Sequence, residues 1–138
     1  MDEKQTDIPE GTCKRSICPV ASALDILGDK WTLLVVRDLL MGKKTYGELQ
    51  DSPEKVPTNI LADRLKRLER AGLLVKEPYQ ERPVRFAYRL TDMGTDLGPV
   101  LQGMMLWANR HIPGTLPFSE VEKLMDRDEE NKNKNGQG

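Results

Sequence analysis

The sequence predicts a mainly α-helical fold that contains one small β-hairpin. Along most of the chain, apolar residues recur every three or four positions, which is typical of amphipathic helices. Between residues 73 and 90 the period changes to two, which is typical of paired strands. With 138 residues, of which 38% are apolar and 31% charged, the chain is long enough for one domain with a single core.

Several classes of protein are excluded by what the sequence lacks. No apolar run approaches the roughly 18 residues that span a bilayer, and the first ten residues do not form a secretory signal, so we expect a cytoplasmic protein without a membrane partner. His111 is the single histidine, and Cys13 and Cys18 are the two cysteines, which is too few for a metal site or for the usual general base. No glycine-rich phosphate loop is present. We therefore expect no enzyme activity, no metal and no cofactor.

Two adjoining helices are predicted first. One runs from Pro19 to Leu27, because proline is well tolerated at the first helical position and Gly28 ends the apolar pattern. In the next, Asp29 is the predicted N-cap and the helix ends near Gly42. Its apolar stripe consists of Trp31, Leu34, Val35 and Leu39.

Two more helices are separated by a turn with two prolines. Residues 45–48 form a T-x-x-E capping box, which predicts a short helix over about residues 46–51. The segment SPEKVP at residues 52–57 cannot continue a helix, because each proline lacks an amide donor and restricts the residue before it. Leucines then recur at helical spacing over residues 58–71, and Gly72 is the predicted C-terminal glycine.

A hairpin and a last helix complete the expected elements. Apolar residues occupy every second position of residues 84–90, and residues 73–79 are the expected partner strand, with QERP at the tip. Thr91 is predicted to cap one final long helix with apolar residues on two sides. We divide the chain into a flexible N-terminal arm (1–17), a domain of helices and hairpin (18–112), and a short amphipathic segment with a disordered polar tail (113–138).

This order of elements is that of a winged helix-turn-helix, in which a basic helix is followed at once by a basic hairpin. Nine cations and four anions lie between Lys55 and Arg89, a net charge of +5 in a chain whose net charge is −1. A basic segment in a near-neutral chain is expected when one face binds a polyanion. We therefore predict that this protein binds double-stranded DNA.

The predicted DNA contacts follow from the docking mode of the fold. The start of the second helix of a helix-turn-helix reads base edges, and later cations contact phosphates. With Leu61 on the buried side, the outward residues Thr58, Asn59, Ala62 and Asp63 are the predicted readers. Lys66 and Arg67 on the helix are the predicted contacts to DNA phosphates. On the wing, Arg82 and Arg85 are predicted to contact the adjacent minor groove. For any single cation, a purely solubilising role is an equally good interpretation.

Three motifs also carry a family resemblance. GDKW, LADRLKRLE-x-AGL and Y-x-LT-x-x-G occur in this order, within a stretch that covers about residues 18–110. In these motifs the chain resembles the HxlR-type winged helix-turn-helix transcription regulators. The resemblance implies a prokaryotic, dimeric, operator-binding protein that is a repressor by family default. It also implies a recognition helix at residues 58–71, a wing at residues 79–84, and DNA contacts ahead of the third helix at Lys43, Lys44 and Thr45.

Two positions depart from the family pattern. Thr45 stands where an arginine is common, which puts one phosphate contact in doubt. Pro57 stands where a capping serine is common, so we expect Thr58 to be the N-cap of the recognition helix.

The last helix predicts a homodimer. A domain of this size cannot cover two apolar sides of one helix, so one side is expected to meet a second subunit, together with part of the first helix. A two-fold dimer places its recognition helices roughly 34–36 Å apart and reads an inverted repeat. The predicted interface residues are Leu97, Leu101, Met104 and Trp107. A core role is the alternative for about half of this stripe.

Cys18 is a candidate redox-sensing residue. It precedes Pro19 and so lies at a helix N-cap, where the helix dipole and free amides favour a thiolate. The resemblance implies more, because some relatives sense oxidants or electrophiles through a cysteine at this position. Two interpretations stay open: an oxidant or small-molecule sensor with Cys13 as a candidate resolving thiol, or a cysteine that only packs.

Two other functions compete with DNA binding. A winged helix can also serve as a protein-interaction module, with acidic partners on its basic face. A thiol-dependent enzyme is disfavoured, because the cysteines are spaced C-x-x-x-x-C rather than C-x-x-C and no acid or base accompanies them. Sequence-specific DNA binding is the prediction that explains both the fold and the charge distribution.

Overall fold

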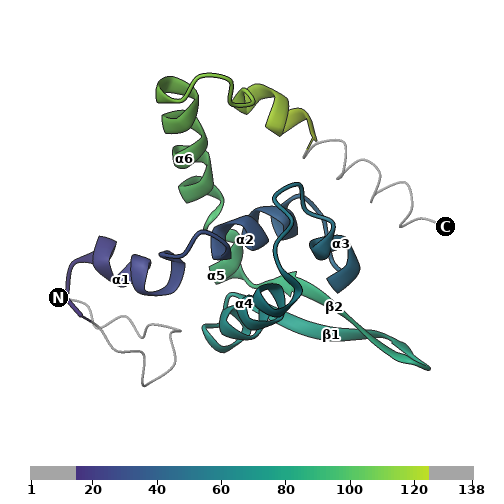
Figure 1. The fold of residues 1–138 in the computed structure, drawn as a ribbon. Helices are drawn as coiled ribbons and strands as arrows, with labels where there is room; N and C mark the ends of the chain where they lie inside the picture. Colours follow the sequence, from purple (N-terminus) through teal and green to yellow (C-terminus); the bar gives the residue numbers. More distant parts are fainter. Residues whose placement is uncertain (1–14, 125–138) are drawn as a thin grey trace.

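The structure of the protein is a computed structural model that describes residues 15–124. In this part of the chain, six helices and one antiparallel hairpin follow one another (Figure 1): α1 (Pro19–Leu27), α2 (Thr32–Leu40), α3 (Tyr46–Gln50), α4 (Thr58–Arg70), β1 (Leu74–Glu81), β2 (Val84–Leu90), α5 (Asp92–Thr95) and α6 (Gly98–His111). Residues 118–124 are also helical. The predicted fold class is confirmed. Most of the expected N-terminal arm, including Cys13, and the expected polar tail lie outside the described residues.

The core lies where α2, α3 and α4 meet the base of the hairpin. Its side chains come from almost every element of the helix-turn-helix and also include one residue of α6; the buried set is Val35, Val36, Leu39, Leu49, Val56, Leu61, Leu65, Leu68, Leu73, Leu74, Leu90 and Leu101. Burial of branched aliphatic side chains is the main stabilising contribution here. None of the helices in the described part of the chain is long and apolar enough to cross a membrane.

α2 begins three residues after the predicted N-cap, but Asp29 still performs the capping. Its carboxylate accepts hydrogen bonds from the backbone N–H of Trp31 at 3.1 Å and of Thr32 at 3.2 Å. The buried side of α2 also differs from the prediction, because Val36 is fully buried whereas Trp31 and Leu34 are partly exposed. The two satisfied amides fix where α2 starts.

Both ends of α4 are well defined by backbone contacts. At its C-terminus, Gly72 has a φ of 84° and its N–H donates to Glu69 O, while Leu73 N–H donates to Leu68 O, so the helix ends in a Schellman motif. At its N-terminus the predicted cap is wrong. Pro57 is the N-cap, in extended conformation, and Thr58 is already helical. The proline φ suits this position without a side-chain hydrogen bond.

The hairpin is longer than predicted, and its alternation is realised only near its base. β1 continues to Glu81, so that Arg82 and Pro83 alone form the connection. Leu90 is buried, but Val84 and Phe86 at the outer end are exposed. The reason is that the hairpin extends beyond the helices that cover its base (Figure 1). A third segment joins the sheet at that base, since Tyr88 N–H donates to Lys44 O at 2.7 Å.

The predicted single final helix is wrong, because the chain breaks into α5 and α6. Thr91 caps α5 as expected, by accepting a hydrogen bond from Gly94 N–H. Pro99, in the first turn of α6, has no N–H to continue a helix from α5, and two glycines flank the break. This break lets α6 leave the domain at an angle, so that its start contacts α2 and its C-terminal end projects from the domain (Figure 1).

Gly94 provides a test of the packing between α5 and the end of α4. A Cβ at this position would lie 2.2 Å from Leu73 O, which is a backbone atom and cannot swing away. We expect Gly94→Ala to lower the free energy of unfolding by about 2 kcal/mol, in the range of overpacked core sites. Chemical denaturation measures this. Gly47→Ala is the control, because nothing lies within 4 Å of its added methyl group, and it should not be destabilising. Equal effects of the two substitutions would contradict this packing.

Candidate nucleic-acid interface

The predicted recognition helix presents a polar, exposed face. Thr58, Asn59, Asp63, Lys66 and Arg67 are exposed and Ala62 is half-buried, whereas the opposite side of α4 carries the buried leucines. The structure therefore places the predicted reader and phosphate-contact residues of this helix on one outward side. α4 also contacts β1, so the helix and the wing are neighbours in the domain (Figure 1).

Three charged residues of α4 form ion pairs within the domain. Asp63 forms ion pairs with Arg64 and, at 3.9 Å, with Arg67. Arg64 Nε also donates to the Asp29 carboxylate at 2.7 Å, so Arg64 joins the recognition helix to the start of α2. Burial alone would raise the pKa of Asp29, but hydrogen bonds from Thr32 and Arg64 outweigh it and lower the pKa to about 2. Helical spacing puts Arg64 nearer the buried side than Lys66 but does not reveal Asp29 as its partner, so the sequence predicted no role for Arg64.

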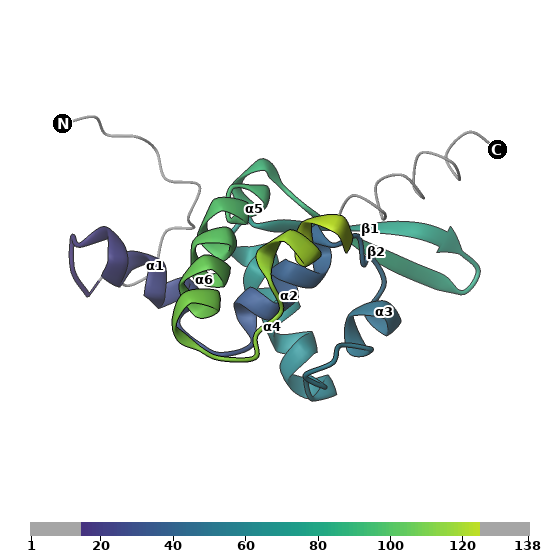
Figure 2. The same cartoon turned by 90° about the horizontal axis from the view of Figure 1, so that it is seen from above.

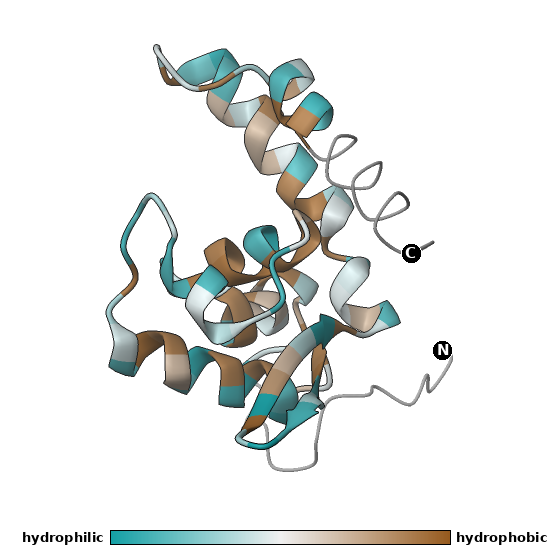
Figure 3. Cartoon of the chain, turned by 90° about the vertical axis from the view of Figure 1, so that its right-hand side faces the viewer, coloured by the Kyte–Doolittle hydropathy of each residue, from teal (hydrophilic) through white to brown (hydrophobic). Residues whose placement is uncertain are grey.

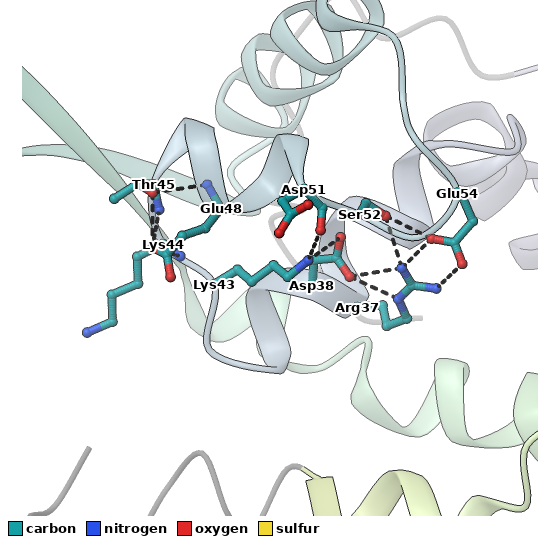
Figure 4. A network of polar contacts seen from close by, with 9 residues as sticks. All are labelled: Arg37, Asp38, Lys43, Lys44, Thr45, Glu48, Asp51, Ser52 and Glu54. Carbon is teal, nitrogen blue, oxygen red and sulfur yellow. Dashed lines mark hydrogen bonds and ion pairs between the residues drawn. The ribbon is translucent and has the colours of Figure 1, made fainter. Parts of the chain in front are cut away.

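A cluster of polar contacts fixes the turn ahead of α4 (Figure 4). The Arg37 guanidinium donates to both carboxylate oxygens of Glu54, at 2.7 and 3.0 Å, and to the buried Asp38 at 2.9 and 3.0 Å. Ser52 Oγ donates to Glu54 at 2.8 Å. We call Arg37, Asp38, Ser52 and Glu54 the turn clamp. The hydrogen bonds from Arg37 hold the pKa of Glu54 at about 2, well below its usual range.

The three predicted contacts ahead of α3 have different surroundings (Figure 4). Lys43 Nζ donates to Asp51 O at 3.0 Å and lies 3.8 Å from the Asp38 carboxylate. The ammonium group of Lys43 is therefore bound by acceptors within the domain. Thr45 and Glu48 form the predicted capping box. Lys44 is exposed and has no ion pair with another described residue. Of the three, Lys44 is the side chain best placed to meet an anion.

The wing carries both paired and unpaired cations. Arg89 Nη2 donates to Glu77 at 2.8 Å across the two strands, and Lys76 lies over the ring of Phe86 at 4.2 Å. Arg82 and Arg85 are exposed, and neither forms an ion pair within residues 15–124. The two arginines predicted from the sequence are therefore the ones whose charge is not neutralised locally.

Exposed cations of α4, the wing and the adjoining turns that form no ion pair among residues 15–124 define the candidate interface. We call six of them the free cations: Lys44, Lys55, Lys66, Arg70, Arg82 and Arg85. Lys76 is also exposed and without an ion pair, but it lies over the ring of Phe86. Lys30 and Arg110 are likewise exposed and unpaired within these residues, but they lie outside these elements.

Lys55 and Arg70 were not among the predicted DNA contacts, although helical spacing places Arg70 on the outward side of α4. Lys55 has a φ of 53° in the turn before α4, a conformation that the residue type alone does not predict. The chemistry of this set is anion binding rather than catalysis. Within the described residues, no cluster of three His, Cys, Asp or Glu side chains is arranged to hold a metal ion.

The predicted dimer residues are divided between core and surface. Leu101 is 8% exposed and packs in the core, and Leu97 is half-buried against it, so neither lies on a free face. Met104 and Trp107 are 51% and 61% exposed. Together with exposed apolar residues of α1, the α6 side that carries Met104 lines a groove of about 600 Å³. Hydrophobic residues occur along α6 where it projects from the rest of the domain (Figure 3).

Cys18 is a free, exposed thiol at the N-cap of α1. The backbone amides of Ala21 and Val20 lower the pKa of the Cys18 thiol below its ordinary value. Ser16 accepts two hydrogen bonds at the start of α1. Its Oγ accepts from Cys18 N–H at 3.0 Å, and its carbonyl oxygen accepts from Ser22 Oγ at 3.3 Å. The interpretation of Cys18 as a buried packing residue is wrong for the described chain, since its side chain is exposed.

Comparison with known proteins assigns this arrangement to a family. The model of the HxlR-like helix-turn-helix family matches residues 26–115, which include α2 to α6. The chain belongs to the HxlR-like helix-turn-helix family. The resemblance seen in the three sequence motifs is thereby confirmed.

Individual relatives in this family are transcriptional regulators by name. An uncharacterised HTH-type transcriptional regulator of Synechocystis, sll1512, is 39% identical over 64% of this chain, which spans just under two thirds (65%) of that relative. YodB of Bacillus subtilis is 34% identical over 78% of this chain and 97% of its own length. The solved reduced form of YodB has a TM-score of 0.60, with 32% identity over 73% of this chain and all of the YodB chain. The redox regulator HypR in its oxidised form has a TM-score of 0.62, with 30% identity over 68% of this chain and 97% of its own.

The turn clamp leads to a pH-dependent prediction. Because the pKa of Glu54 is about 2 in the fold and about 4.3 in an unfolded chain, its ionised form stabilises the fold above about pH 4.3, and this contribution is lost as the pH falls towards 2. Since Glu54 is partly exposed, solvent screening limits the effect to about 1 kcal/mol or less. We expect Glu54→Gln to be less stable than the parent protein at pH 7 and equally stable near pH 2.

Denaturant unfolding at several pH values measures this difference. Glu81→Gln removes a carboxylate that forms no ion pair with a described residue and should leave the pH profile unchanged. A constant difference between parent and Glu54→Gln across the whole pH range would contradict the role of the clamp.

Proposed function

We propose that this protein is a sequence-specific DNA-binding transcriptional regulator that acts as a repressor and binds an inverted-repeat operator as a homodimer. The observation that supports the proposal is that some cations are bound within the domain and others are not. Arg37, Lys43 and Arg64 are bound to acidic groups or carbonyls within the domain, whereas the free cations lie on α4, on the hairpin and on the turns next to them. Unpaired cations on a recognition helix and a wing match the phosphates on either side of a groove. The family membership supports the same function.

Base reading is assigned to the first turns of α4. Thr58 and Asn59 are exposed there, and an asparagine can pair in a bidentate manner with adenine in the major groove. Asp63 is an acceptor for cytosine N4–H only if it gives up part of its contacts with Arg64 and Arg67. Lys66 and Arg70 lie further along the helix, where phosphate contacts are expected. Arg82 and Arg85 reach the neighbouring minor groove from the wing.

The homodimer is assigned to α1 and α6. Val20 and Leu24 on α1 and Val100 and Met104 on α6 are all exposed, and all four line the same groove. None of the residues of α1 is buried in the single chain, which is unusual for an apolar helix and is explained when a second copy covers it. We therefore place the dimer interface on this groove and on Trp107, rather than on Leu101.

Cys18 is assigned as the redox-sensing residue of the regulator. Its thiol is exposed and its pKa is lowered, and both properties favour reaction of the thiolate with oxidants. Solved structures of the related proteins support this, since one is named a redox regulator and YodB was solved both reduced and after diamide treatment. Since Cys18 lies next to α1, a change at this thiol acts on the proposed dimer interface first.

An anisotropy titration tests the DNA-binding proposal. A labelled duplex from upstream of the protein's own gene is compared with a scrambled duplex at two salt concentrations. We expect tight, steeply salt-dependent binding to the first and weak binding to the second. A Kd that is equal and weak for both duplexes, and for duplexes enriched by selection from random sequence, would contradict the proposal and favour a protein-interaction module.

Substitutions on α4 should separate reading from phosphate contact. Lys66→Ala should weaken binding to all duplexes by roughly five- to tenfold near 0.1 M salt and reduce the salt slope by about 1. Asn59→Ala should instead reduce discrimination between duplexes by about 1–3 kcal/mol at one base position per half-site. Arg110→Ala is the control, because it removes an exposed cation of α6 away from the interface. The assignment fails if Arg110→Ala and Lys66→Ala weaken binding equally.

The Cys18 assignment predicts a low thiol pKa. The rate of alkylation by iodoacetamide, measured against pH, should show an apparent pKa below that of a cysteine in an unfolded peptide, and oxidation should change the DNA affinity. Cys18→Ser should abolish the oxidant response. An ordinary cysteine pKa together with an unchanged DNA affinity after oxidation would contradict a sensing role.

The dimer assignment predicts an effect of charge on one side of α6. Met104→Glu places a carboxylate in the apolar groove and should shift the protein from dimer to monomer in sedimentation velocity, with loss of inverted-repeat binding. Gln102→Glu adds the same charge two residues earlier, outside this groove, and should leave the dimer intact. A dimer that survives Met104→Glu would show that the interface lies elsewhere.

A further inference from the structure

A second pocket lies on the other side of α6 and is separate from the proposed dimer groove. It has a volume of about 470 Å³ and is formed by the C-terminal half of α2, the start of α6 and the helical residues 118–124. Figure 2 shows residues 118–124 lying over α2, beside α6. A volume between 300 and 1,000 Å³ is typical of a site for a small organic molecule.

The outer wall of this pocket is held in place by Asn109. Its Nδ2 donates to Thr115 Oγ1 at 3.0 Å and to Leu116 O at 2.9 Å, and its Oδ1 accepts from Phe118 N–H at 2.9 Å. These three hydrogen bonds reverse the chain after α6. As a result, Phe118 and Val121 face Leu101 and Met105 of α6 across the pocket.

The lining of the pocket is mainly apolar and includes groups that suit an aromatic ligand. Met41, Met105 and Phe118 are half-buried, so each offers part of its surface to the pocket. Thioethers adapt to varied ring shapes, and an aromatic ring also attracts cations over its face. The polar lining residues are Arg37, Gln102 and Glu122.

The charge balance of the pocket favours a cation. Arg37 donates to the carboxylates of both Asp38 and Glu54, so its positive charge is offset by two neighbouring anions. Glu122 at the rim is exposed and has no ion pair with another residue of 15–124. A ligand with a positive charge would therefore meet one unpaired carboxylate and a guanidinium that is already neutralised.

We propose that this pocket binds a compact aromatic organic cation, with its rings against Met41, Met105 and Phe118 and its charge towards Glu122. The pocket also has a direct connection to the recognition helix. Arg37 forms part of its wall and at the same time holds Glu54 of the turn before α4. Occupancy next to Arg37 therefore changes the surroundings of the turn clamp and alters DNA affinity. This second step rests on the proposed DNA-binding function, whereas the binding step does not.

Methionine methyl signals test the location of the ligand. The full chain is labelled with ¹³C at its methionine methyl groups and titrated with tetraphenylphosphonium, an aromatic cation that does not intercalate into DNA. Met41 and Met105 line the pocket, and Met104, the neighbouring residue in the chain, lines the dimer groove instead. We expect saturable shifts of Met41 and Met105 and none of Met104. Shifts of Met104 alone, or no saturable shift, would overturn the proposal.

Substitutions in residues 118–124 test the ligand chemistry without touching the core. Glu122→Gln should weaken tetraphenylphosphonium binding roughly two- to fivefold in calorimetry, as expected for a solvent-exposed charge. Val121→Lys should weaken it about tenfold or more, because it places a like charge in the apolar mouth. Glu120→Gln is the matched control, since Glu120 pairs with Lys123 and does not line the pocket. Equal affinities for all four proteins would overturn the proposal.

The link to DNA is tested separately. The operator affinity of the parent protein is measured with and without saturating tetraphenylphosphonium, and we expect a change of about fivefold or more. The Val121→Lys variant should bind DNA normally and show no change. Ligand binding without any change in DNA affinity would overturn the proposed connection through Arg37. Failure of the protein to bind DNA in either state would instead contradict the proposed function and leave the binding site supported.

Discussion

The position of the recognition helix depends on the ionic contacts of Arg37. The α3–α4 turn contains two prolines and a residue in the left-handed region, so regular backbone hydrogen bonding alone cannot define its path. Arg37 of α2 joins this turn to the helix through Glu54, and the buried Asp38, its neighbour on α2, holds the guanidinium in position. From the other end of α2, Asp29 binds Arg64. One ion pair therefore holds the turn before α4 to α2, and another holds α4 itself to the start of α2.

This scaffold explains why the charged residues of the domain divide into two groups. Arg37, Lys43 and Arg64 are neutralised by acidic or carbonyl groups and orient the helices. The free cations lie on the outward side of α4, on the wing and on the turns beside them. Asp29, Asp38 and Glu54 are used within the scaffold, whereas cations outnumber anions between Lys55 and Arg89, so a near-neutral chain can present a basic segment.

α6 has a different role on each of its sides. One side carries Met104 and lines the groove with α1, and the other carries Met105 and lines the pocket under residues 118–124. Leu101 attaches the helix to the core between them. The proposed dimer interface and the proposed ligand pocket therefore lie on separate sides of α6.

The sequence predicted the elements that local chemistry determines. The range of α1 follows from Pro19 and Gly28, the capping box of α3 from Thr45 and Glu48, and the end of α4 from Gly72, and the structure confirms all three. Wrong or missing predictions concern contacts between distant residues. Leucine spacing does not reveal that Leu101 belongs to the core, and helix periodicity does not show that Arg64 binds Asp29, 35 positions away. Similarly, apolar alternation predicted a buried wing face, but no helix covers the outer end of the hairpin.

The most direct test of this account is affinity cleavage from the recognition helix. An iron chelate that generates hydroxyl radicals is attached to Asn59→Cys in a protein whose Cys13 and Cys18 are replaced by serine, and the cleaved operator strands are mapped. The account predicts two clusters of cleavage, in major-groove positions of two half-sites about one helical turn apart. Cleavage spread evenly along the duplex, or a single cluster at one site, would contradict a dimer that reads DNA through α4.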